Sequence, residues 1–249
     1  MITDSFDAKS DAIINAKPVE NRVKCDVCIA TFSAQIEQFA VKKFNAQKVA
    51  EYKCVTGIFP VYLFEYNGKK IAIYQTLLGA PASVGALEDV TKFIDVKKFV
   101  VFGSAGTLDR ETCYGKVMVP THAYRDEGTS YHYAKAEDYI VIKNSNVVES
   151  FMQKYKIPYV SGRCWTTDAF YRETKNNFLK RKNEGCIAVD MECSAMQAVA
   201  DFRDLDLYYF LLSGDLLDAP EWDDRKLHSA NHDYENFYIA LKLADEISN

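Results

Sequence analysis

The residues best suited to chemistry in this sequence lie around Glu192, in the run 189–195. An apolar run, 186–189, ends there, and a run with helical spacing, 194–202, begins. In an open α/β sheet, ligand sites are built at the carboxyl ends of strands. A carboxylate at that position can accept hydrogen bonds from a pair of hydroxyl groups, which makes a sugar the first ligand to consider. The alternative is an acid in the first turn of a helix, which the helix macrodipole favours.

A second candidate segment, 100–107, is rich in small residues. We expect a strand that runs into a turn at 103–106. Glycine lets the backbone approach a ligand closely, and the turn amides with the Ser104 hydroxyl could hold an anion. The spacing matches neither a Walker loop nor a dinucleotide fingerprint. A tight turn without a ligand is the alternative.

The elements that must position these residues are predicted from runs of apolar residues. Strands are predicted at 27–31, 61–66, 71–78, 99–103, 117–119, 159–165, 187–191 and 207–213. Helices are predicted at 34–44, 84–93, 147–155, 176–181, 194–202 and 231–247. Alternating strands and helices imply a mostly parallel sheet covered on both faces, and Asn67-Gly68 is a hairpin signal that makes the sheet mixed. We therefore predict an α/β fold, a three-layer α/β/α sandwich around a mixed, mostly parallel central sheet.

Composition narrows the class of protein. Residues 1–249 show no linker, repeat or low-complexity tract, so one domain is predicted, with 1–20 as a polar and flexible arm. The net charge of −5 argues against nucleic acid or an anionic membrane surface as partner. No signal-peptide pattern is present and no apolar run reaches the roughly 20 residues that span a bilayer. We therefore expect a cytoplasmic protein.

Cysteine and histidine spacing gives no metal site. The seven cysteines are an odd number spread through apolar runs, which suits free thiols in a reducing compartment. Cys25 and Cys28 have redox or zinc spacing, but they lie in a strand-like run without a second pair. His228 and His232 stand four apart on a predicted helix without the metalloprotease glutamate. We predict no metal and no organic cofactor.

Four segments in order resemble one known family. They are Gly-Ser-Ala-Gly at 103–106, the run 119–133 with its Arg-Asp-Glu-Gly-Thr-Ser-Tyr-His-Tyr end, Trp-Thr-Thr-Asp-Ala-Phe-Tyr at 165–171, and Asp-Met-Glu-Cys-Ser-Ala at 190–195. From about residue 26 to the last helix, the chain resembles the nucleoside phosphorylase family, which includes purine nucleoside and uridine phosphorylases and related nucleosidases. Family members are dimers or hexamers, so the resemblance implies a homo-oligomer.

The resemblance implies roles for residues that match the family pattern. Met191 and Glu192 look like the pair that packs under the ribose and accepts its 2′- and 3′-hydroxyls. Phe170 resembles the aromatic residue that stacks on the nucleobase; a plain core phenylalanine is the alternative. Gly103 and Ser104 resemble part of the phosphate site.

Asp215 lies 23 residues after Glu192 (215 − 192) and resembles the aspartate that protonates a purine base. Breaking an N-glycosidic bond builds positive charge on the sugar and negative charge on the departing base. A carboxylic acid that protonates the base removes the second charge, provided that burial raises its pKa. A turn acid at a strand end is the alternative, since other aspartates lie close behind it. The loop 79–81 resembles the family loop that enters the same pocket.

The phosphate end departs from the family pattern. Family phosphorylases commonly hold phosphate with arginines, and the matching positions here are Val101, Gln35 and Gly57. A dianion in a partly dry pocket is poorly compensated without cations, so the phosphate site is atypical. The segment 172–176 also lacks the Gln and Arg spacing of uridine phosphorylases, which disfavours a pyrimidine base.

The sequence thus predicts a pentosyltransferase of nucleoside salvage. It would cleave a purine nucleoside with inorganic phosphate as co-substrate, giving free base and ribose 1-phosphate, with Arg172, Arg125, Arg163 or the Gly-Ser turn completing the anion site. A nucleosidase is an alternative, although Gln35 cannot serve as its first-loop glutamate and Glu37 is offset. A uridine phosphorylase and a nucleoside-binding protein without turnover also stay open.

Overall fold

A ten-stranded sheet forms the centre of the structure, a computed structural model that describes residues 1–218, 221–224 and 232–248. Its strands are β2 (Val27–Thr31), β3 (Gln47–Cys54), β4 (Gly57–Tyr66), β5 (Lys69–Gln75), β7 (Lys98–Thr107), β8 (Val117–Asp126), β9 (Tyr139–Val141), β10 (Tyr159–Thr167), β11 (Cys186–Asp190) and β12 (Asp206–Leu216). They lie in the order β11-β10-β8-β12-β7-β2-β5-β4-β3, with β9 beside β8. The neighbours β5, β2, β7 and β12 are parallel, whereas β3, β4 and β5 are antiparallel, so the sheet is mixed as predicted.

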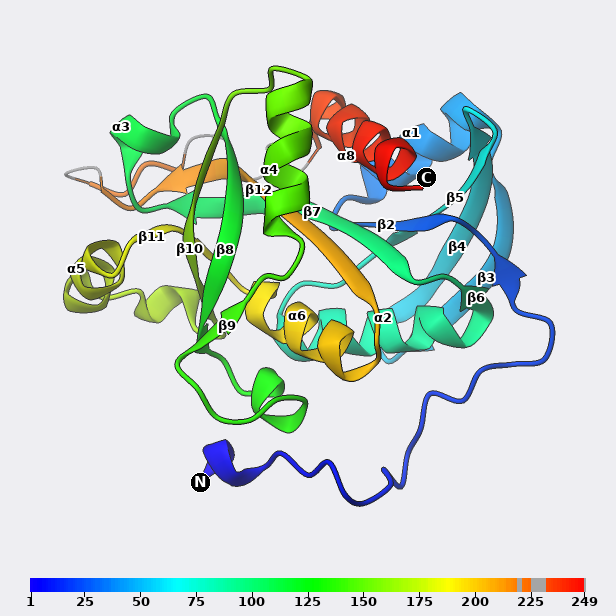
Figure 1. Cartoon of the computed structure of the whole chain (residues 1–249), viewed down its shortest axis with the longest axis horizontal. Helices are drawn as coiled ribbons and strands as arrows, with labels where there is room; N and C mark the ends of the chain where they lie inside the picture. The colour runs from blue at the N-terminus through cyan, green and yellow to red at the C-terminus, as the bar shows by residue number, and fades with distance from the viewer. Residues whose placement is uncertain (219–220, 225–231, 249) are drawn as a thin grey trace.

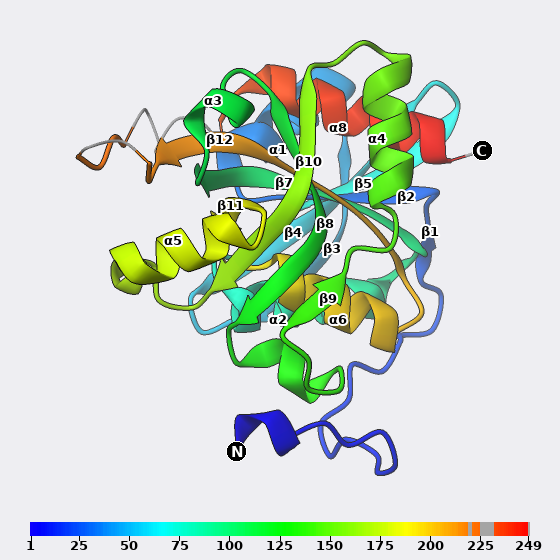
Figure 2. The same cartoon turned by 60° about the vertical axis from the view of Figure 1, so that its left-hand side comes forward.

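Helices cover both faces of the sheet, which confirms the predicted α/β architecture (Figure 1). One face carries α1 (Ala34–Phe44), α4 (Ser145–Lys154) and α8 (Tyr234–Ile247), and the other carries α2 (Ala80–Phe93) and α6 (Cys193–Phe202). The shorter helices are α3 (Arg110–Cys113), α5 (Lys175–Asn183), η1 (Ile2–Asp4), η2 (Thr129–His132) and η3 (Phe170–Arg172). In Figure 2, α5 lies beside β10 and β11 at the sheet edge.

The strand β7 belongs to both hydrophobic cores. Successive side chains of a strand point to opposite faces, and here Phe99 and Val101 pack with α2 and α6 while Val100 and Phe102 pack with α1, α4 and α8. All four are almost fully buried. Burying each such side chain contributes about 1.5–3 kcal/mol, so this strand holds the two helical layers together and fixes the position of the residues after Phe102.

Some details of local structure differ from the prediction. Residues 103–106 are not a turn, because β7 continues to Thr107 with β12 paired along its length and β11 paired at Gly106. The strand β3 was not predicted, because it is an edge strand in which only Tyr52 is buried and its apolar alternation is weak. The predicted hairpin is confirmed between β4 and β5, where Asn67 and Gly68 both have positive φ, 50° and 77°.

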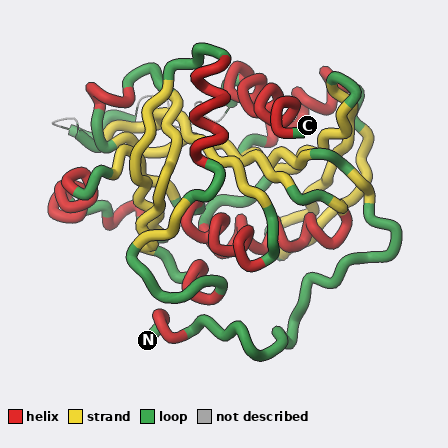
Figure 3. The backbone as a smooth tube through the Cα atoms, viewed as in Figure 1, coloured by secondary structure: helices red, strands yellow, loops and turns green. Residues whose placement is uncertain are grey.

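The first 22 residues form an arm that runs below α2 and α6 (Figures 1 and 2). Figure 3 shows it as loop apart from a short helix near its start. The Val19 amide donates to the Lys92 carbonyl over 2.9 Å, and the Phe6 ring meets Phe202 edge-on. Beyond it, β1 (Val23–Lys24) pairs with β6 (Ile94–Asp95). Within the described ranges, the helices are all too short or too polar to cross a membrane.

Candidate functional site

A gap in strand pairing lies in the middle of the sheet, on one side of β7. On that side β2 pairs with β7 as far as Phe102, and β11 pairs with it from Gly106 onward. On that side, none of the described strands pairs with Gly103–Ala105. On the other side, β12 pairs with all three residues. We call Gly103–Ala105 the β7 gap. Strands that diverge in this way create the crevice in which open α/β sheets bind ligands.

The loops after β2 and β11 both start at the β7 gap. Val189 of β11 is the last residue paired with β7, opposite Gly106, so Met191 follows two residues after this pair and Ser104 precedes Gly106 by two residues within the gap. Met191 and Ser104 are both half-buried. The ribose candidate Met191 and the anion candidate Ser104 therefore lie at the same break in strand pairing.

Asp190 fixes the turn that leads out of β11. It is buried, and one carboxylate oxygen accepts from Thr166 Oγ1 over 2.8 Å while the other accepts from Tyr209 Oη over 3.0 Å and from the Cys193 amide over 2.8 Å. Burial raises the pKa of Asp190, and these hydrogen bonds oppose the rise. With so many partners, Asp190 serves to hold the next residues of the chain in place.

Glu192 is the central carboxylate of the site. It is 5% exposed and occupies the N-cap position of α6, yet its side chain does not cap that helix. Its Oε1 instead accepts from the Gly79 amide over 2.6 Å, in the loop between β5 and α2. Burial, with the charge of Asp190 as the second cause, raises the pKa of Glu192 to about 8. Glu192 thus stands at the start of α6, as the helix-start alternative expects, but its side chain bonds to the loop before α2 and not to its own helix.

Gly79 has φ +92°, in the region that favours glycine. This conformation directs its amide at Glu192, so the loop 79–81 does meet the ribose candidate, as the resemblance implies.

The base-stacking candidate Phe170 lies in η3, just after β10. β10 runs parallel to β11, with Thr166 paired to Asp190, so η3 continues from the same edge of the sheet. Phe170 is 48% exposed and its ring centroid is 4.1 Å from that of Tyr171. The core alternative for Phe170 is therefore wrong, and its exposed ring is available to a flat ligand.

Asp215, at the end of β12, is half-buried. Its Oδ2 accepts from the Trp222 indole over 2.7 Å. A Cβ on Gly106 would come within 3.2 Å of Asp215 Oδ1 and within 2.7 Å of Val189, so only glycine fits beneath this acid. The proposed acid thus lies beside β7, close to the β7 gap.

Sequence reasoning missed Glu173 and Trp222. Glu173 comes directly after η3, and its amide donates to the Phe170 carbonyl over 3.2 Å. Burial, with the charge of Asp215 as a smaller cause, raises the pKa of Glu173 to about 7. Neither residue lies in a segment that resembles the family, so no signal in the sequence pointed to either.

The arginines offered for the anion site serve other purposes, with one exception. The buried Arg125 donates to Ser130 Oγ over 2.8 Å and to the Lys135 carbonyl over 2.6 Å, and it stacks on Tyr131. Arg163 donates to the Glu184 carbonyl and stacks on Tyr139.

Arg172 is exposed, and its guanidinium makes no hydrogen bond, ion pair or ring contact with the described residues. Of the three arginines, it alone donates no hydrogen bond from its guanidinium to a described residue.

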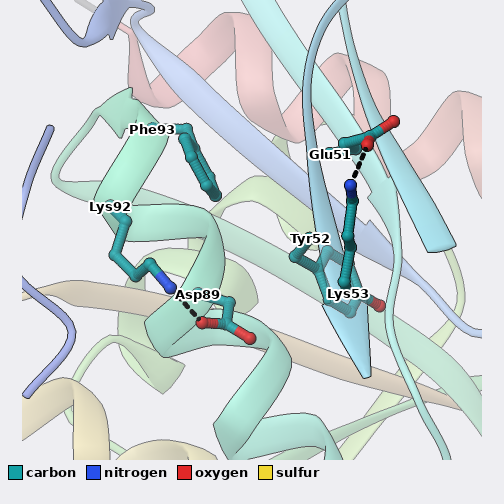
Figure 4. Close-up of a pocket in the computed structure, with 6 residues that line it drawn as sticks. All are labelled: Glu51, Tyr52, Lys53, Asp89, Lys92 and Phe93. Carbon is teal, nitrogen blue, oxygen red and sulfur yellow. Dashed lines mark hydrogen bonds and ion pairs between the residues drawn. The ribbon is translucent and has the colours of Figure 1, made fainter. Parts of the chain in front are cut away.

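A surface hollow of about 410 Å³ lies apart from these residues, between β3 and the end of α2 (Figure 4). Tyr52 and Phe93 line it, flanked by the ion pairs Glu51–Lys53 and Asp89–Lys92 at 3.0 and 2.8 Å. None of the candidate site residues lines this hollow.

Known proteins resemble this chain in sequence. The phosphorylase superfamily matches residues 27–247. A DeoD-type purine nucleoside phosphorylase of Exiguobacterium sp. is 23% identical over 206 residues, covering 82% of this chain and 86% of that protein. The DeoD-type enzyme of Bacillus velezensis is 26% identical over 167 residues, covering 64% and 70%. An uncharacterized protein of Acanthamoeba polyphaga mimivirus is 24% identical over 188 residues, covering 74% and 73%.

Proposed function

Because the chain belongs to the phosphorylase superfamily, we propose that it is a nucleoside phosphorylase acting on purine nucleosides. A phosphate oxygen bonds to C1′ of the ribose, the bond from C1′ to the base nitrogen breaks, and the products are free base and ribose 1-phosphate. The observation that carries the proposal is the buried Glu192 carboxylate beside the β7 gap, held by the Gly79 amide. The purine preference is supported by the DeoD-type relatives.

The proposed roles match the chemistry of the reaction. Glu192, with Met191 beneath the sugar, accepts the ribose hydroxyls, and its hydrogen bonds tighten as the sugar becomes positively charged. Phe170 stacks on the base, and Asp215 transfers a proton to the base as it leaves. Ser104 and the Gly103 backbone contact the phosphate. These groups come from β7 and the ends of β10, β11 and β12, which converge on the β7 gap.

The experiment is base release from inosine, adenosine and uridine, each with and without inorganic phosphate. Phosphate-dependent release from the purine nucleosides is the expected result. Release that ignores phosphate would replace the proposal with a nucleosidase, and preferential cleavage of uridine would replace it with a uridine phosphorylase. If nucleoside raises the thermal stability of the protein but no base is released, the protein binds nucleosides without cleaving them.

We further propose that the enzyme works in the cytoplasm as a homo-oligomer, a dimer or a hexamer as family resemblance implies. Sedimentation velocity distinguishes both states from a monomer.

A further inference from the structure

A histidine close to the C-terminal helix lies beside the β7 gap. His232 Nδ1 is 2.6 Å from Ser33 Oγ, a contact between residues 199 positions apart. Thr31 and Phe102 are the last paired positions of β2 and β7. Ser33 and Ser104 each lie two residues beyond those positions, where the pairing of β2 with β7 has ended. The contact therefore places His232 on the β2 side of the gap.

The hydrogen bonds of Ser33 determine which ring nitrogen of His232 carries a proton. Ser33 is fully buried, and its Oγ already accepts from the Ile36 amide over 3.1 Å as the N-cap of α1. A buried hydroxyl needs an acceptor for its own proton, and His232 Nδ1 is within reach. In the neutral ring, a proton-accepting Nδ1 leaves the proton on Nε2. His232 then presents an N–H donor on the side of the ring away from Ser33.

That donor is available to a ligand. His232 is half-buried, and its Nε2 makes no hydrogen bond to any residue in the described parts of the chain. Two acids close to this contact in the sequence, one four residues after Ser33 and one directly after His232, have other partners. Glu37 accepts from the Gln75 amide over 2.9 Å, and Asp233 accepts from the Glu235 amide over 2.9 Å at the start of α8.

We propose that His232 binds the phosphate co-substrate through Nε2–H and determines the affinity of the β7 gap for it. This inference rests on the proposed function for the identity of its ligand. His232 would compensate for arginines that the sequence lacks at Val101 and Gln35, by donating a hydrogen bond to an anion next to Ser104.

Two substitutions at one position separate this role from a structural one. In His232→Asn, the amide lies near the Nδ1 position, so Ser33 keeps a partner but the Nε2 donor is lost. In His232→Gln, the amide reaches the Nε2 position, so a donor is kept while Ser33 loses its partner. His122→Asn is the matched control, because His122 is also half-buried and its Nδ1 also contacts a hydroxyl, Thr121 Oγ1 at 3.2 Å, on β8.

The measurement is calorimetric titration of inorganic phosphate into each protein without nucleoside, with sodium chloride at matched ionic strength as the blank. His232→Asn should weaken phosphate binding by about 10- to 100-fold, the effect of losing a hydrogen bond to a charged group. His232→Gln and His122→Asn should stay close to the wild type. Thermal unfolding without phosphate verifies that each variant is folded.

Several outcomes overturn the inference. Phosphate binding equal in His232→Asn and the wild type would do so, as would a larger loss in His232→Gln, which would point to the Ser33 contact. A wild type that binds phosphate no better than chloride would also reject it. If phosphate binds through His232 but no base is released, the proposed function is wrong and the inference stands. If turnover depends on phosphate but the phosphate KM is unchanged in His232→Asn, the inference is wrong and the proposed function stands.

Discussion

Replacing Glu192 with glutamine should lower activity and, at alkaline pH, raise the free energy of unfolding. The carboxylate is 5% exposed and its pKa is raised to about 8, from an ordinary value of 4.5, by burial and by the charge of Asp190. Ribose hydroxyls donate hydrogen bonds, so they bind the ionised form. One unit below the pKa, at pH 7, about a tenth of the free protein carries that form. The kcat/KM for nucleoside, measured at saturating phosphate, should therefore rise about tenfold from pH 7 to pH 9 and then level off.

The size of the loss in Glu192→Gln is set by the hydrogen bonds removed. The Gly79 amide occupies Oε1, so the variant turns an amide nitrogen, which cannot accept, toward the sugar. Each hydrogen bond to a charged group contributes about 1.5–3 kcal/mol. With two ribose hydroxyls, kcat/KM at pH 9 should fall about 10²- to 10⁴-fold, and the rise between pH 7 and pH 9 should disappear.

Stability should change in the opposite direction. A carboxyl whose folded pKa lies above its unfolded value stabilises the protein at low pH, and that contribution is lost as pH rises from about 4.5 through 8. Glutamine does not titrate, so Glu192→Gln should be more stable than the wild type at pH 9 by a few kcal/mol in urea unfolding. The difference should vanish near pH 4.

The assay is spectrophotometric base release from inosine at pH 6–9, with Glu37→Gln as the matched control. Glu37 is also buried and also accepts a single backbone amide, from Gln75. Activity in Glu192→Gln within tenfold of the wild type at pH 9, or a pH dependence that survives the substitution, would refute the ribose assignment. Loss of turnover in Glu37→Gln would instead give that acid a part in the reaction.

Three further predictions concern other side chains. The pKa of Glu37 is raised by burial to about 7, so its stabilising effect is lost from pH 4.5 to 7. The free energy of unfolding of Glu37→Gln, measured in urea, should therefore exceed that of the wild type by up to about 3 kcal/mol at pH 8 and should equal it near pH 4. Asp215→Asn should slow inosine cleavage about 10²- to 10⁴-fold but leave 4-nitrophenyl riboside, whose leaving group needs no proton, cleaved at the wild-type rate. Phe170→Ala should raise the inosine KM about 10- to 100-fold through lost stacking; Tyr171→Ala, at an 89% exposed position, is its control and should not.

The sequence revealed the parts of the site that are local in the chain. The end of the apolar run before Asp190 located Glu192, and small residues after Phe102 located Ser104. The β7 gap itself was not predictable, because it depends on where β2 stops and β11 starts along β7, and pairing between distant strands leaves no local pattern. The assumption of a turn at 103–106 failed for the same reason. The contact of Ser33 with His232 spans 199 residues and was likewise invisible.

The raised pKa values of the acids bear on how an anion could enter this site with few cations. A phosphate dianion beside ionised carboxylates would be repelled in a partly dry pocket. Glu192 and Glu173, with pKa values of about 8 and 7, are largely or partly protonated near neutral pH, which lowers the negative charge that the anion meets. Ionisation of Glu192 then favours the ribose and opposes the phosphate. When the nucleoside binds first, its hydroxyls donate hydrogen bonds to the Glu192 carboxylate and reduce the repulsion that the phosphate meets. We therefore expect nucleoside to bind before phosphate, whereas a site lined with arginines would not need this binding order. Affinity for the two substrates should accordingly respond to rising pH with opposite signs, which ties the atypical phosphate end to the same buried carboxylate that holds the sugar.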